Sequence, residues 1–149
     1  MFITEIPVRG DVDIYLLDRE YNILHEVHDH NIVTSLGRDY FARKVGDDPS
    51  ITSTISHISI GSGEVPFPRV GDIALSAETA TAPIISRIYN FNIFTVASLF
   101  DVGEGTGVLA EAGLYTDDAT RKLLCRIVFP TFVKGPSELL SVQWKLKFG

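Results

Sequence analysis

The amino-acid sequence predicts a mainly β protein: an antiparallel β-sandwich or barrel-like domain with one short helix near residues 35–45. Three observations lead to this fold class. Short runs alternate apolar and polar side chains, turn-forming residues separate the runs about every ten positions, and only one early stretch has a helical pattern. The 149 residues fit a single domain, 1–149. Within it we expect an N-terminal hairpin (1–33), the short helix (34–46) and a main β region (55–149).

The N-terminal part has the pattern of a hairpin followed by the helix. An alternating run from Val12 to Leu17, a polar turn over 18–22 and a second extended run over 23–33 predict two paired strands. Thr34 or Ser35 can cap a helix that stops at Gly46, although Gly37 weakens its interior. Four apolar residues of this helix are expected to face the core: Leu36, Tyr40, Phe41 and Val45.

The middle of the chain predicts strands separated by turns. Ile58 and Ile60 alternate with Ser59 in a strand that stops at the glycines after it. Residues 72–78 are expected to form one helical turn. The tract over 84–100 has seventeen residues of β type, which exceeds a typical strand. A break near 89–92 is therefore expected to divide it into two strands.

The C-terminal third contains the clearest strand pattern. After extended runs over 108–115 and 123–129, the closing segment alternates apolar and polar side chains at a strict period of two. One face of this strand is therefore predicted to lie in the core or in an interface. Its candidate residues are Leu140, Val142, Trp144, Leu146 and Phe148.

Charge and hydropathy limit the classes of partner. The net charge is −6, yet residues 1–120 contain eighteen acidic and seven basic side chains, whereas residues 121–149 contain one acidic and six basic side chains. Such a split suits complementary contacts within or between subunits better than nucleic-acid binding, which usually needs a broad basic surface. No apolar run has the length of a membrane span. We therefore expect neither nucleic acid nor a membrane as partner.

The histidines His25, His28 and His30 form the densest cluster of possible metal ligands. On a strand, His28 and His30 point to the same face, as a metal-dependent β-barrel enzyme could use. Such a site would be expected to have a glutamate a few residues later, and 31–39 contains none. The preferred interpretation is a solvated or interface strand, with no metal, and the enzyme stays as the competing hypothesis.

Other residues that could carry chemistry have simpler structural interpretations. Glu111, flanked by small residues, is expected to be a buried acid that pairs with a lysine or arginine of the basic C-terminal segment. Cys125 lies in an apolar run, where a thiol is normally inert. The glycines of 103–107 lack the spacing of a nucleotide-binding loop. The sequence thus predicts no catalytic residue, no cofactor and no enzymatic activity.

Three segments, taken in order, carry a resemblance to a known group of proteins. They are Asn31-Ile32-Val33-Thr34, then residues 55–63 (ISHISIGSG), then Glu111-Ala112-Gly113-Leu114-Tyr115 followed by 126–130 (RIVFP) and 142–144 (VQW). In this order they resemble small β-rich virion structural proteins of tailed bacteriophages, a head-decoration or tail-fibre-like family with a Glu-Ala-Gly-Leu-aromatic motif. The aromatic residue is Tyr115 here, a mild departure from the usual pattern.

This resemblance implies a non-enzymatic virion protein, assembled in the cytoplasm of the host bacterium. A capsid decoration, or cement, protein is preferred to a tail-fibre, adaptor or baseplate component, because the chain is short and has neither heptads nor repeats. The implied partners are other copies of the chain, in a homo-oligomer expected to be a trimer, and the major capsid protein or other virion proteins. The family signature implies no cofactor and no binding site.

Overall fold

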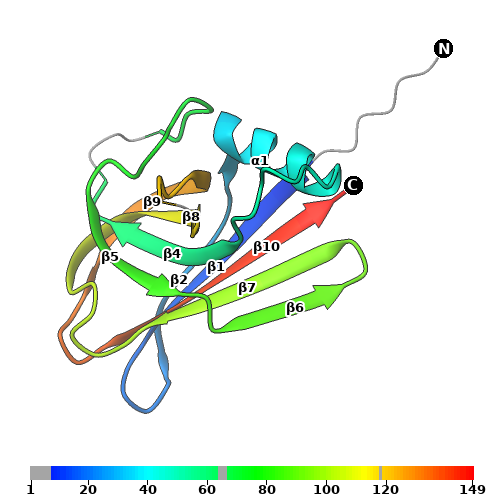
Figure 1. Cartoon of the computed structure of the whole chain (residues 1–149). Helices are drawn as coiled ribbons and strands as arrows, with labels where there is room; N and C mark the ends of the chain where they lie inside the picture. Colours follow the sequence, from blue (N-terminus) through cyan, green and yellow to red (C-terminus); the bar gives the residue numbers. More distant parts are fainter. Residues whose placement is uncertain (1–7, 64–66, 118) are drawn as a thin grey trace.

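The strands pair through backbone hydrogen bonds into two antiparallel sheets, each with five strands (Figure 1). Their alternating apolar side chains give each sheet an apolar face. The computed structural model describes residues 8–63, 67–117 and 119–149. The first sheet has the order β2-β1-β10-β7-β6 and the second the order β3-β9-β8-β4-β5. In the first sheet the strands are β1 (Val8–Leu17), β2 (Ile23–His30), β6 (Ser86–Asn90), β7 (Ile93–Phe100) and β10 (Leu139–Phe148). In the second they are β3 (Ile32–Val33), β4 (Ile55–Gly61), β5 (Glu78–Pro83), β8 (Gly107–Thr116) and β9 (Leu123–Lys134).

The two sheets are separate and share one core, so the fold is a sandwich, one of the two predicted alternatives. Strand β10 lies in the middle of the first sheet, between β1 and β7. Its alternating residues Leu140, Val142, Trp144 and Leu146 are fully buried, and Phe148 is half-buried. The indole Nε1 of Trp144 donates to Oδ1 of Asn31 at 3.2 Å, where the chain crosses from β2 to β3.

Helix α1 (Ser35–Val45) packs against β9 across one end of the sandwich. Thr34 caps it: its Oγ1 accepts from the backbone N–H of Gly37 at 3.0 Å and donates to the carbonyl of Leu123 at 2.6 Å. A Cβ at position 37 would lie 2.2 Å from the carbonyl oxygen of Leu124. Glycine therefore weakens the isolated helix but permits its close approach to the sheet. Within the described ranges, no helix is long and apolar enough to cross a membrane.

Two sequence-based expectations are wrong, one for helix α1 and one for residues 72–78. Tyr40 and Phe41 are buried as expected, but Val45 is 81% exposed. Being the last residue of α1, it lies in the wall of an open groove of about 1250 Å³ between the helix and the ends of β1 and β10.

The helical turn expected over 72–78 does not form, because backbone N–H groups of this segment donate to side chains of β8. Glu78 already belongs to β5.

The expected break in the tract over 84–100 is confirmed. Strands β6 and β7 form a hairpin, and their turn contains Phe91 with a positive φ of 59° and Asn92. Figure 1 shows this hairpin at the free side of the first sheet, extending beyond the second sheet. Strand β6 pairs only with β7 and is therefore an edge strand.

Candidate functional site

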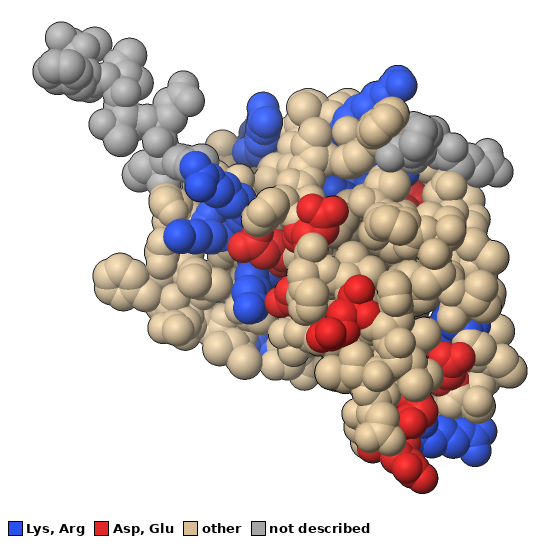
Figure 2. Space-filling view, turned by 180° about the vertical axis from the view of Figure 1, so that it is seen from behind, with Lys and Arg blue, Asp and Glu red and all other residues tan. Residues whose placement is uncertain are grey.

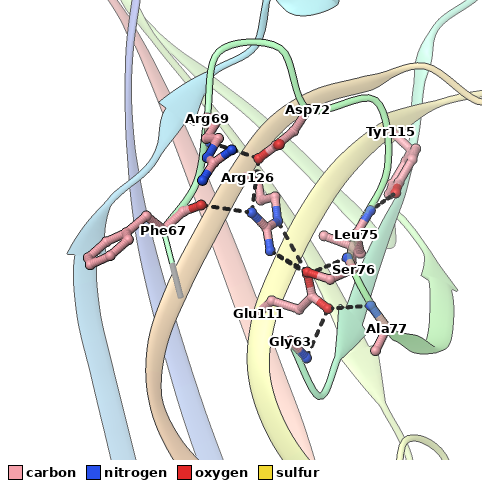
Figure 3. Close-up of polar contacts among 10 residues, drawn as sticks. All are labelled: Gly63, Phe67, Arg69, Asp72, Leu75, Ser76, Ala77, Glu111, Tyr115 and Arg126. Atoms are coloured by element: carbon pink, nitrogen blue, oxygen red, sulfur yellow. Dashed lines mark hydrogen bonds and ion pairs between the residues drawn. The ribbon is translucent and has the colours of Figure 1, made fainter. Parts of the chain in front are cut away.

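The outer face of the second sheet is covered by an irregular segment, residues 67–77, which we call the covering segment. Strand β8 is consequently buried on both faces, unlike an ordinary sheet strand with one face in water. Its residues Leu109, Ala112 and Leu114 belong to the core. Glu111 and Tyr115 lie beneath the covering segment (Figure 3). This interface contains the buried ion pair of Glu111 and Arg126 and the hydrogen bonds around it.

Glu111 is fully buried, and both of its carboxylate oxygens accept hydrogen bonds (Figure 3). Oε2 accepts from the backbone N–H groups of Gly63 at 2.9 Å and Ala77 at 2.8 Å. Oε1 accepts from the N–H of Ser76 at 2.9 Å and from Nη2 of Arg126 at 2.9 Å. The carboxylate thereby joins β8 to both ends of the chain between β4 and β5.

Arg126, on the neighbouring strand β9, is 1% exposed and supplies the matching positive charge. Its Nη1 donates to Oδ2 of Asp72 at 2.9 Å and to the carbonyl of Phe67 at 3.4 Å. Its Nη2 also donates to Oγ of Ser76 at 2.8 Å. The guanidinium group therefore binds the beginning, the middle and the end of the covering segment, as an arginine with its fixed set of donors can.

Tyr115 adds an apolar contact and one more hydrogen bond. Its hydroxyl oxygen accepts from the N–H of Leu75 at 3.0 Å, and the two side chains cluster with Leu123. A Cβ at Gly113 would lie 2.7 Å from Cδ1 of Leu123 and 3.0 Å from Cδ2 of Leu75. Burial raises the pKa of Tyr115. In the Glu-Ala-Gly-Leu-Tyr motif, the glutamate thus accepts hydrogen bonds from the covering segment, the glycine leaves room for Leu75, and the tyrosine ring packs against it.

The electrostatics of Glu111 suit a structural role. Burial opposes its ionisation, but the N–H groups of Ala77 and Ser76 and the guanidinium of Arg126 outweigh this effect and lower its pKa. A carboxylate that stays ionised, with both oxygens already accepting bonds from the protein, is poorly placed to take a proton from a substrate. This arrangement holds a chain segment against a sheet. The partner expected in the basic C-terminal segment is Arg126.

The histidines of β2 divide between the two faces of the first sheet. His28 and His30 share the outer face, where Nδ1 of His28 lies 2.6 Å from Oδ1 of Asp13 and His30 pairs with Asp11. His25 is on the opposite face and packs on the ring of Phe132, with centroids 4.7 Å apart. The three rings therefore do not converge on one point.

The pairs on the outer face border a hollow of about 340 Å³, where Lys145 Nζ lies 3.4 Å from Oδ2 of Asp13. The hydrogen bond to Asp13 raises the pKa of His28. In the described part of the chain, no group of three or more His, Cys, Asp or Glu side chains is placed to hold a metal ion. Cys125 is buried, and burial raises the pKa of its thiol.

Sequence reasoning missed part of the cluster under the covering segment. Asp72 and Ser76 are separated from Glu111 by 39 and 35 positions, and both lie in the segment for which a helical turn was wrongly expected. No local signal marks them. Arg126 did carry a signal, because a single charge within the apolar run of 123–129 requires a buried partner.

Comparisons with protein-family models, with curated proteins and with solved structures find no match to this chain.

Proposed function

We propose that this protein is a non-enzymatic structural subunit of a tailed-bacteriophage particle, and that it decorates the capsid as a cement protein. It would be located in the virion, with other copies of itself and the major capsid protein as partners. The bacteriophage assignment comes from the sequence resemblance. The role in assembly is supported by the exposed side chains of the β6–β7 hairpin.

This hairpin is the single observation that carries the proposal. Tyr89 is 74% exposed, Phe91 is fully exposed, and Ile85 and Ile88 are more than half exposed. Tyr89 stacks on Phe94 of β7, with ring centroids 4.9 Å apart, so the two rings lie together on the hairpin. Several large apolar side chains exposed on one hairpin favour a protein-protein contact site. Aromatic residues in particular are enriched at such sites.

The distribution of charge agrees with protein partners. On the face seen in Figure 2, acidic and basic side chains lie interspersed among uncharged ones, without a broad basic area. Several cations of the basic C-terminal segment have acceptors within the chain, as Arg126 has in Glu111 and Lys145 in Asp13. The buried Lys134 donates to the carbonyl of Asp101 at 3.1 Å. Much of the charge difference between residues 1–120 and 121–149 therefore serves contacts within the subunit.

A metal-dependent enzyme is not proposed, because His25 lies on the opposite face from His28 and His30. The buried acid Glu111 has both oxygens occupied by donors of the chain itself. Neither group is free to form a site for catalysis.

The number of copies in the particle tests the capsid role. Quantitative mass spectrometry of purified virions would give the ratio of this chain to the major capsid protein. A cement protein is expected in numbers comparable with those of the capsid subunits. A small number that matches the rotational symmetry of the tail would overturn decoration and indicate an adaptor, fibre or baseplate component. Absence from purified virions would overturn the structural role altogether.

A further inference from the structure

We propose that the edge strand β6 pairs antiparallel with β6 of a second copy of this chain, across a twofold axis centred on Ile88. The two first sheets would then form one continuous ten-stranded sheet, since each has five strands with β6 at its edge. The biological role of this contact rests on the proposed function, in which copies of the chain assemble with one another. The contact itself follows from the geometry of β6.

The backbone of β6 is available for pairing on one side. Residues 90 and 93 flank the two-residue turn and form the pair that closes the hairpin. Because antiparallel pairs alternate between hydrogen-bonded and non-hydrogen-bonded types, Ser86, Ile88 and Asn90 direct their backbone groups toward β7. The N–H and C=O groups of Arg87 and Tyr89 then point away from the sheet.

This edge lacks the features by which proteins usually prevent strand addition. It contains no proline and no lysine, its register with β7 has no bulge, and Arg87 carries its only charge. The opposite edge of the same sheet, β2, exposes the charged or titratable side chains of Glu26, His28 and His30. Of these two edges, β6 is the one suited to accept another strand.

The register centred on Ile88 satisfies the free backbone groups. Arg87 of each copy lies opposite Tyr89 of the other, so the two outward-pointing residues exchange both backbone hydrogen bonds. Ile88 meets Ile88 of the second copy as a close non-hydrogen-bonded pair, and Ser86 meets Asn90. A register centred on Arg87 would place like charges directly opposite each other, which is destabilising. In the favoured register Arg87 lies opposite Tyr89 of the second copy, so no like charges meet, and its guanidinium can keep its hydrogen bond to the carbonyl of Ile55 in its own chain.

The same properties favour a second copy over an unrelated strand. The sequence Ser86-Arg87-Ile88-Tyr89-Asn90 has an apolar centre and polar ends, so it is complementary to itself when reversed. A twofold contact uses the same patch on both subunits and closes without further members. A trimer would need a different, heterologous surface, and β6 would then join neighbouring trimers.

The experiment combines mass measurement with a designed disulfide. Light scattering of the purified protein over a range of concentrations is expected to give dimers or larger even-numbered assemblies. Ile88→Lys places two ammonium groups opposite each other and is expected to abolish the pairing. Val108→Lys, at another exposed apolar strand position in the second sheet, is the matched control and is expected to leave it unchanged. Circular dichroism verifies that both variants are folded.

Ile88→Cys supplies a positive test, because Cα atoms of a non-hydrogen-bonded pair lie about 4.5 Å apart, within disulfide range. Mild oxidation is expected to give a covalent dimer, whereas Val108→Cys should not, and the buried Cys125 does not compete. A monomer that never cross-links, a dimer that survives Ile88→Lys, or cross-linking of Ile88→Cys to a different protein in virions would each overturn the proposal. None of these results depends on copy number in the particle, so the capsid role is tested separately.

Discussion

At the scale of single residues, Glu111 is the acceptor that holds the covering segment against the sheet. We expect Glu111→Gln to lower the free energy of unfolding by about 3–5 kcal/mol, because the buried guanidinium of Arg126 loses its buried carboxylate and keeps only the more exposed one of Asp72. Urea denaturation measures the change. The exposed pair of Asp39 and Arg43, 3.0 Å apart, gives the control: Asp39→Asn is expected to change stability by less than about 1 kcal/mol.

A double variant, Glu111→Leu with Arg126→Leu, separates this cluster from an isolated ion pair. Apolar replacement of a buried pair is often neutral. Here the double variant is expected to be less stable than the original protein, because the N–H groups of Gly63, Ser76 and Ala77 lose their acceptor. Each N–H group left buried and unsatisfied costs about 1–3 kcal/mol. A double variant as stable as the original protein would contradict this account.

At the scale of elements, helix α1 is positioned by a residue that weakens it. Alanine at position 37 would raise the stability of the isolated helix by about 0.8–1.0 kcal/mol. We nevertheless expect Gly37→Ala to lower the midpoint of thermal unfolding, since its Cβ would lie 2.2 Å from the carbonyl oxygen of Leu124. Arg38→Ala, at the exposed next position, is expected to have little effect. A stabilised Gly37→Ala variant would mean that α1 does not pack tightly on β9.

At the scale of the whole molecule, both sheets share one core, and Trp144 is its largest fully buried side chain. Trp144→Ala is expected to remove about 3–5 kcal/mol from a total of about 5–15 kcal/mol. Because the core is shared, secondary structure and tertiary packing should be lost together, in one transition at lower denaturant concentration. Far- and near-ultraviolet circular dichroism measure the two. Separate transitions would show that the sheets are independently stable, and an unchanged midpoint would show that Trp144 contributes little to the core.

The sequence predicted those parts of the fold that depend on local periodicity. Alternation located β10 and its buried face, and excess length revealed the β6–β7 break. The expected turn over 72–78 was wrong, because its backbone groups are satisfied by side chains of β8 that are distant in sequence. Val45 fits the helical period but lies past the helix's contact with the sheet.

The site was predictable to the same extent. The small residues around Glu111 indicated burial, and the basic C-terminal segment indicated a partner, but not which cation. Selecting Arg126 requires the pairing of β8 with β9, which sets Gly113 opposite Arg126 and Glu111 opposite Val128. Asp72 could not be found, because its role depends entirely on how the covering segment crosses the sheet.

The covering segment also has a consequence for the order in which the chain folds. Its acceptors and donors on the sheet, Glu111 and Arg126, come from two different strands that must pair before they present a common surface. The segment is therefore expected to dock late, after the main barrier to folding. Contacts that are absent at that barrier slow unfolding more than they speed folding. The Glu111 and Arg126 contacts thus favour a long lifetime of the folded state, so they set its kinetic stability more than the rate at which it forms.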